Sequence, residues 1–200
     1  MKVLWLFFLV VAGLPWQSAL AAEAGAGEET GLELRSVQAD FVQVKHLKIL
    51  ARPLVSTGTF AFQVPQSLRW EYLEPVRSVL IMHNGAVRKF VERDGQLEEE
   101  RGAQVGSLQI VLAEISNWLA GRFTDNAMFT VSFIDERTIR FTPKEQQLAA
   151  LITGIEIEIG GENGLLDSVL IEEGPDSYTK MTFSNRSINQ QLPAKLFTAP

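Results

Sequence analysis

Apolar and polar residues alternate with a period of two along most of the chain after residue 36. Alternation of this kind is typical of strands that bury one face. Phe60 and Phe62 share a face in one run, and Leu68, Trp70 and Tyr72 share a face in the next. The pattern predicts strands over residues 37–45, 57–63, 68–72, 78–82, 87–91, 96–100, 129–133, 139–141, 155–159, 165–172 and 178–185.

Two dipeptides between these runs indicate tight hairpins. Asn84-Gly85 separates two predicted strands, and Asp94-Gly95 separates the next two. A two-residue type I′ turn needs positive φ at both central positions, which asparagine, aspartate and glycine tolerate best. The strands are therefore expected to be mostly antiparallel, and a sheet of this size tends to curl.

One segment, residues 104–120, has the spacing of a helix instead. Its apolar residues recur every three or four positions, and Gly121 follows where a left-handed cap is favoured. These apolar residues are Val105, Leu108, Val111, Leu112, Ile115, Trp118 and Leu119. A shorter helix is expected around residues 29–35 and a turn near 145–150. The fold class is therefore mainly β with helices (α+β).

The N-terminal residues 1–22 have the pattern of a secretory signal peptide. Lys2 precedes an apolar run, Pro15 ends it, and small residues follow up to Ala22. Residues 23–30 are small and acidic, which is typical of a flexible leader. Residues 31–200 are then expected to form one domain. The chain contains no cysteine, so it has neither disulfides nor a lipid-attachment thiol, and we expect it in the periplasm.

The sequence offers no candidate catalytic residue, metal ligand or cofactor site. His46 and His83 have no acidic partner at ligand spacing, and no serine stands in a nucleophile-elbow motif. Residues 98–100 are consecutive glutamates, which alternate between faces of a strand and fit a solvated edge. The net charge of −6 and the lack of a basic stripe argue against nucleic acid as a partner. We expect a protein that is not an enzyme.

Two stretches carry a resemblance to a known family. Residues 37–58 read VQADFVQVKHLKILARPLVSTG, and residues 60–75 read FAFQVPQSLRWEYLEP. Together with Asn84-Gly85, FTPK at 141–144 and FTAP at 197–200, they resemble the periplasmic outer-membrane lipoprotein carriers, the LolA family. The resemblance extends over essentially the whole chain after the signal segment.

This resemblance implies an incomplete antiparallel β-barrel, a half-barrel with a helical lid over an apolar cavity. The resemblance also implies that this cavity would hold lipoprotein acyl chains. A monomeric carrier would receive them from an inner-membrane transporter and pass them to an outer-membrane acceptor. Exposing an acyl chain to water costs about 0.8 kcal/mol per CH₂, so transport needs a dry enclosure. The candidate lipid-binding residues are Phe60, Phe62, Val64, Leu68, Trp70 and Tyr72 on the sheet and Leu108, Leu112, Ile115 and Leu119 on the lid.

One departure from the family leaves the cargo open. Relatives place an arginine before the first proline, where it holds the lid closed, and this chain has Val64 there. The alternatives are carriage of another acyl lipid, such as a glycolipid or polyene-type lipid of a divergent branch, and a non-catalytic periplasmic scaffold or sensor. Aromatic alternation by itself is also compatible with an ordinary packed core.

Overall fold

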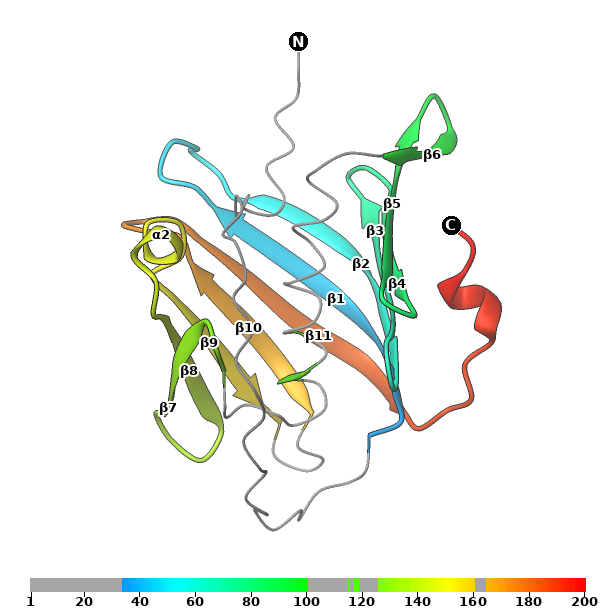
Figure 1. The fold of residues 1–200 in the computed structure, drawn as a ribbon. Helices are drawn as coiled ribbons and strands as arrows, with labels where there is room; N and C mark the ends of the chain where they lie inside the picture. The colour runs from blue at the N-terminus through cyan, green and yellow to red at the C-terminus, as the bar shows by residue number, and fades with distance from the viewer. Residues whose placement is uncertain (1–33, 101–114, 116, 119–125, 161–164) are drawn as a thin grey trace.

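The computed structural model describes residues 34–100, 115, 117, 118, 126–160 and 165–200. They form a mainly β structure built on one antiparallel sheet (Figure 1). The strands are β1 (Ser36–His46), β2 (Leu54–Gln63), β3 (Ser67–Glu74), β4 (Ser78–His83), β5 (Ala86–Arg93), β6 (Gln96–Glu100), β7 (Phe129–Phe133), β8 (Thr138–Pro143), β9 (Gly154–Ile159), β10 (Leu166–Glu172) and β11 (Tyr178–Ile188). Every strand predicted from alternation is confirmed.

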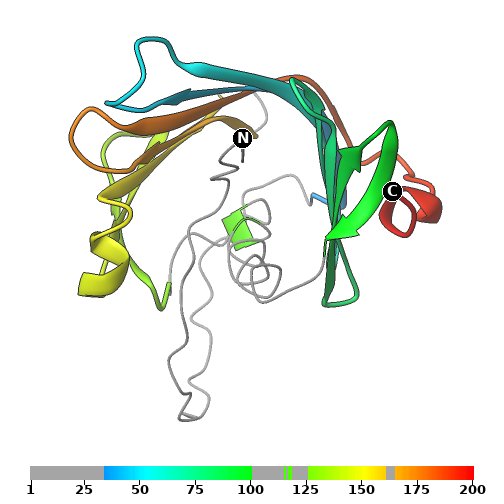
Figure 2. The same ribbon diagram turned by 90° about the horizontal axis from the view of Figure 1, so that it is seen from above.

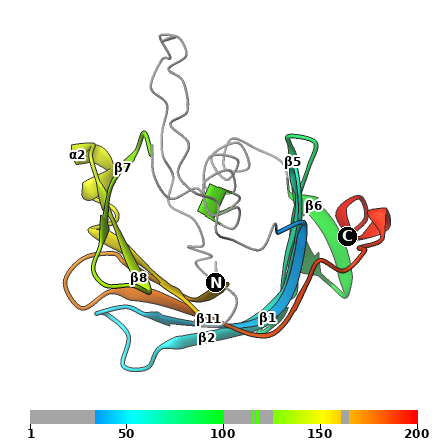
Figure 3. The ribbon, with the colours of Figure 1, turned by 90° about the horizontal axis from the view of Figure 1, so that it is seen from below.

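The order of the strands in the sheet is β6-β5-β4-β3-β2-β1-β11-β10-β9-β8-β7. Consecutive strands pair with each other except β6 and β7, and β1 also pairs with β11, which joins the two halves. The edges are β6 and β7, so the sheet does not close on itself. Figures 2 and 3 show that it curves around one side of the molecule, which confirms the predicted open antiparallel half-barrel.

Both predicted two-residue turns are present. Asn84 and Gly85 have φ of 49° and 78°, and Asp94 and Gly95 have φ of 50° and 76°. Positive φ at both positions is the requirement of a type I′ hairpin. Local turn chemistry therefore determines the β4–β5 and β5–β6 connections.

Helical structure is sparse in the described part of the chain. Ile115, Asn117 and Trp118 are helical, as the spacing over 104–120 predicts, and the other residues of that segment lie outside the described residues. The expected turn near residue 145 is the short helix α2 (Gln146–Ala149), and η1 (Ala194–Phe197) is a 3₁₀ turn. Of the shorter helix predicted at 29–35, only residues 34 and 35 are described, and they are not helical. None of the helices described is long and apolar enough to span a bilayer.

The concave side of the curved sheet carries the main hydrophobic core, which we call the apolar face. It combines side chains from both halves of the sheet with Trp118. Its buried members are Val37, Ala39, Phe41, Phe60, Phe62, Leu68, Trp70, Leu80, Met82, Trp118, Phe129, Ile139, Phe141, Ile155, Ile157, Val169, Met181 and Phe183.

The convex side of the sheet is covered locally by the C-terminal segment. Phe197 of η1 is buried against Ala61 and stacks on the ring of His83 at 6.4 Å. The Arg69 guanidinium donates to the backbone carbonyl of Ala199 over 2.6 Å and holds the chain end in place. The FTAP motif at 197–200 therefore packs on the convex side of β3 and β4 and is held there by Arg69.

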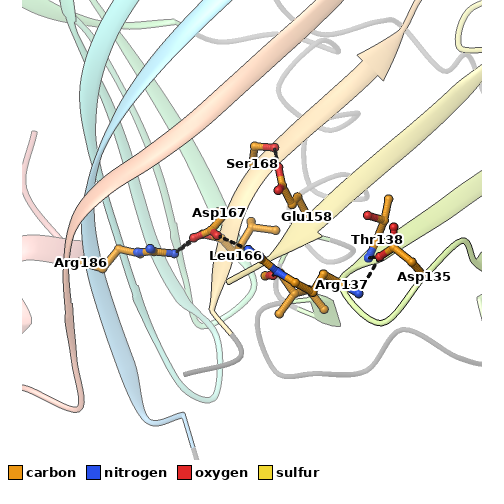
Figure 4. Close-up of polar contacts among 9 residues, drawn as sticks. Asp135, Arg137, Thr138, Glu158, Leu166, Asp167, Ser168 and Arg186 are labelled. Carbon is orange, nitrogen blue, oxygen red and sulfur yellow. Dashed lines mark hydrogen bonds and ion pairs between the residues drawn. The ribbon is translucent and has the colours of Figure 1, made fainter. Parts of the chain in front are cut away.

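Polar contacts bind the second half of the sheet together at one end (Figure 4). Asp167 accepts hydrogen bonds from Arg137 over 3.1 Å and from Arg186. The Asp135 carboxylate caps the β7–β8 turn by accepting from the backbone N–H groups of Arg137 and Thr138, each over 2.8 Å. The convex side of this half is thus polar and its concave side apolar, as expected for a half-buried antiparallel sheet.

Candidate functional site: the apolar face

The centre of the apolar face is a group of aromatic rings from β1, β2, β3 and β11. Phe41 lies 5.4 Å from Trp70 and 5.1 Å from Tyr72, measured between ring centroids. Phe60 lies 5.2 Å from Trp70 and 6.0 Å from Phe183. Tilted and edge-on contacts at these separations are the favourable geometry for aromatic pairs.

Gly58 allows this group to form. It pairs with Phe41 across the β1–β2 ladder, and the Phe41 ring lies over its backbone. A β-carbon at this position would stand 2.0 Å from the backbone oxygen of Glu71 and 2.6 Å from Phe41 Cζ. Any side chain here would displace either the ring or strand β3.

Most of the predicted lipid-binding residues in the described part of the chain come together on the apolar face. Phe60, Phe62, Leu68 and Trp70 are buried members of it. Two more, Tyr72 and Ile115, are partly buried and pack against it. Leu108, Leu112 and Leu119 lie outside the described residues.

Val64 is the exception, because it is not among the residues that pack on this face. Strand β2 ends at Gln63, and the Val64 backbone N–H donates to the carbonyl of Arg35 over 3.0 Å. The Val64 side chain is 37% exposed and does not belong to the apolar face.

The other wall of the apolar face comes from the second half of the sheet, where the sequence pattern predicted no lipid-binding residue. Phe129, Ile139, Phe141, Ile155 and Ile157 are buried there. Trp118 packs on this wall, with its ring 4.9 Å from that of Phe141. The strand alternation in 139–141 and 155–159 carried the signal, but placing these strands opposite β2 and β3 requires knowledge of the β1–β11 pairing.

One end of the concave side is polar. Along β1 the inward residues change from Val37, Ala39 and Phe41 to Gln43 and then Lys45. The other members of this polar end are Tyr72, Glu173 and Thr179. Lys45 Nζ donates to both Glu173 carboxylate oxygens, over 2.7 and 2.6 Å, and lies 3.3 Å from Thr179 Oγ1.

Within the polar end, Tyr72 Oη donates to Gln43 Oε1 over 2.8 Å. Burial raises the pKa of the Tyr72 hydroxyl far above its usual value, and the Trp70 indole offsets only part of that rise. The hydroxyl therefore keeps its proton at every pH at which the protein would be used. The Gln43 Nε2 atom is buried and has no hydrogen-bond acceptor among the described residues.

An ion-pair cluster lies behind Trp70, on the convex side of β3. The Glu71 carboxylate accepts from Arg69 over 2.8 and 3.0 Å and from Arg77 over 2.8 and 2.9 Å. Burial raises the pKa of Glu71, but the hydrogen bonds and charges of the two arginines outweigh it, so the pKa is lowered from the usual 4.5. Arg69 also donates to the C-terminal segment, so the cluster connects that segment to the convex side of β3.

Acid should destabilise the protein partly through Glu71. A carboxyl group with a lowered pKa in the folded state contributes stability that is complete above its unfolded pKa, and this contribution is lost as the pH falls through the folded pKa. Glu71→Gln is expected to lower the free energy of unfolding at pH 7 by about 2 kcal/mol. It should also flatten the decline below pH 4.5. Urea unfolding between pH 7 and pH 3 measures both effects.

The matched control is Glu98→Gln. The Glu98 side chain is exposed and meets Arg93 only at 3.8 Å. This variant should retain wild-type stability at pH 7 and the wild-type acid decline. An acid decline in Glu71→Gln equal to that of the wild type would contradict the assignment.

The two histidines and the glutamates of residues 98–100 make contacts within the sheet rather than forming a site. His83 shares a hydrogen bond of 2.8 Å with Ser67 Oγ, and His46 stacks on Tyr178 at 5.3 Å. Glu99 and Glu100 pair with Arg88 and Lys89 across the β5–β6 edge hairpin. Among the described residues no group of three His, Asp or Glu side chains is placed to hold a metal ion.

Comparison with known proteins agrees with this architecture. The family model described as "Outer membrane lipoprotein carrier protein LolA" matches residues 33–200. The chain belongs to the LolA family. It is 31% identical to an outer-membrane lipoprotein carrier protein of Ralstonia nicotianae, over 94% of this chain and 90% of the relative. It is 28% identical to the carrier protein of Methylococcus capsulatus, over 82% of this chain and 76% of the relative.

Among solved structures, the chain is similar to a LolA superfamily protein of Nitrosomonas europaea. It is 11% identical, with a TM-score of 0.41, over 86% of this chain and 93% of that chain. The family membership confirms the resemblance on which the lipid-binding residues were assigned. The part that each of these residues plays in lipid binding stays a prediction.

Proposed function

We propose that this LolA-family chain is a periplasmic carrier that binds the acyl chains of lipoproteins on its apolar face and carries them from the inner to the outer membrane. The observation that carries the proposal is the apolar face itself, a concave surface of aromatic and aliphatic side chains on a sheet that stays open between β6 and β7. Burial against such a surface offsets about 0.8 kcal/mol for each CH₂ removed from water. An open sheet also lets the chains leave again.

We propose further that segment 104–120 is the lid over this surface, with Leu108, Leu112, Ile115 and Leu119 facing the sheet. Two described residues of the segment support this role. Ile115 packs against the apolar face, and Trp118 is buried in it. In the absence of cargo these side chains would occupy the place of acyl chains, and cargo would displace them.

Carriage in one direction requires a donor and an acceptor. An inner-membrane transporter would load the protein and an outer-membrane acceptor would unload it, with the carrier itself monomeric. Export would use residues 1–22 as a cleaved signal peptide, followed by the leader 23–30. No catalytic step, metal or cofactor enters this cycle, because transfer needs only a difference in acyl affinity between successive partners.

A second cargo class is favoured by the position of Val64. This residue replaces the arginine expected from the family, and its side chain lies outside the apolar face. Closure of the lid over the apolar face would then depend on apolar contacts alone. Such contacts do not distinguish a peptide headgroup from another headgroup. A glycolipid or polyene-type lipid is therefore the alternative cargo.

Displacement of an apolar fluorophore tests the proposal. The chain without residues 1–22 should enhance the fluorescence of such a probe, and a triacylated lipopeptide should displace it at lower concentration than a glycolipid of equal chain length. The reverse order would select the second cargo class. Failure of every acyl ligand to displace the probe would contradict a carrier and favour the scaffold or sensor.

A further inference from the structure

We infer that Gln43 is a hydrogen-bond donor for a carbonyl oxygen of the bound acyl group, and that it sets the direction in which the cargo lies along the sheet. This inference rests on the proposed carriage of acyl chains and specifies which atoms of the cargo the protein recognises. The ligand chemistry is that of an acyl ester or acyl amide, in which the carbonyl marks the boundary between the apolar tail and the polar headgroup.

The first observation is a buried side-chain donor without a partner in the described part of the chain, at the border of the apolar face. Gln43 is only 2% exposed, and it lies on the same side of β1 as Phe41 and Ala39. Its Nε2 atom has no acceptor among the described residues. A buried amide N–H without a partner costs about 1–3 kcal/mol, so the site favours a ligand that brings an oxygen to it.

The second observation fixes which end of the amide is open. Tyr72 remains protonated and donates to Gln43 Oε1 over 2.8 Å. With its oxygen occupied in this way, the side chain presents its N–H₂ group as the remaining polar function. A carbonyl oxygen, which accepts and cannot donate, complements that group.

The third observation is the position of Gln43 along the strand. Two residues earlier Phe41 belongs to the aromatic group, and two residues later Lys45 pairs with Glu173. Gln43 therefore stands at the boundary between the apolar face and the polar end. An acyl chain with its carbonyl at Gln43 would extend its tail over Phe41 and Phe60 and its headgroup past Lys45.

The experiment compares probes that differ only in the carbonyl. The chain without residues 1–22 is titrated with a long-chain monoacyl ester, the corresponding N-acyl amide, and an alkyl ether of equal length. The wild type should bind the ester and the amide more tightly than the ether by roughly five- to twentyfold, the gain expected of one hydrogen bond to a buried donor. Gln43→Leu should bind all three probes with nearly equal affinity.

Gln38→Leu is the matched control, because Gln38 lies on the same strand with its side chain on the opposite face. It should retain the wild-type preference. Infrared spectra of a ¹³C-labelled ester carbonyl add a readout that is independent of affinity. The bound band should lie at lower frequency in the wild type and in Gln38→Leu than in Gln43→Leu.

The possible results distinguish a failure of the Gln43 role from a failure of acyl carriage. A wild type that binds ester and ether equally would overturn the role of Gln43 and leave acyl carriage standing. That role is likewise overturned if Gln43→Leu, folded by circular dichroism, keeps the ester preference and the band position. A wild type that binds none of the three probes would overturn both proposals together.

Discussion

Replacing Gly58 with alanine is expected to lower the free energy of unfolding by about 3 kcal/mol or more, the upper range for overpacking a core. The added methyl group would stand 2.0 Å from the backbone oxygen of Glu71, which cannot move without breaking the β2–β3 ladder. It would also push the Phe41 ring away from Trp70 and Tyr72. Urea denaturation followed by tryptophan fluorescence measures the loss.

Gly95→Ala is the control for the loss of a glycine as such. Gly95 has φ of 76°, but no atom stands within 4 Å of the position of a β-carbon there. Only the cost of a left-handed backbone remains, about 1 kcal/mol. Equal losses in the two variants would contradict the close approach of Phe41 to the backbone of β2.

Trp70→Glu is expected to weaken acyl binding by roughly tenfold or more, equivalent to at least about 1.4 kcal/mol. The carboxylate would stand among Phe41, Phe60 and Phe183, where it has no partner and opposes the removal of water that acyl binding requires. Displacement of the apolar fluorophore by a lipopeptide measures the effect. Circular dichroism establishes that the variant is folded.

Val42→Glu supplies the matched control, since it places the same charge on the opposite face of the sheet. Val42 lies on β1 between the inward residues Phe41 and Gln43, and its side chain is 42% exposed. Acyl affinity should stay within about twofold of the wild type, since surface substitutions usually change free energies by less than about 0.5 kcal/mol. A folded Trp70→Glu variant with unchanged uptake would contradict the assignment of the apolar face.

The strands and tight turns could be predicted because their signals are local. A period of two in residues 57–63 identifies β2, and Asn84-Gly85 identifies the β4–β5 turn without reference to the rest of the chain. Alternation also predicts which side chains of a strand lie on the same side of the sheet. Phe60, Phe62, Leu68 and Trp70 were assigned correctly to one surface in this way. Val64 stands one residue beyond the end of β2 and is exposed, so its part in lipid binding stays a prediction.

The opposite wall of the apolar face could not be predicted, because it depends on contacts between distant parts of the chain. Pairing of β1 with β11 brings Phe41 opposite Phe183, far apart in sequence. No short-range pattern encodes that partner. The burial of Arg69 and Glu71 could not be predicted for the same reason. Alternation places them on the face opposite Trp70, where polar residues are usually exposed, but the C-terminal segment and the arginines bury them.

Gln43 shows a third kind of limit. It lies in the stretch 37–58 that carries the family resemblance, but it was not among the candidate lipid-binding residues. Its burial and its bond from Tyr72 become visible only when β3 stands beside β2 and β1 in three dimensions. A polar residue in an inward position of an apolar strand is the signal that could have identified it.

Native mass spectrometry of the protein purified from periplasm, followed by lipid extraction, would show whether the apolar face carries acyl cargo. We expect a complex near one cargo molecule per chain, with either a triacylated lipoprotein or a defined acyl lipid as the bound species. Trp70→Glu purified in parallel should carry little or none. A wild-type protein that is empty, and that also rejects acyl chains added after purification, would contradict the proposal that the apolar face is a carrier site.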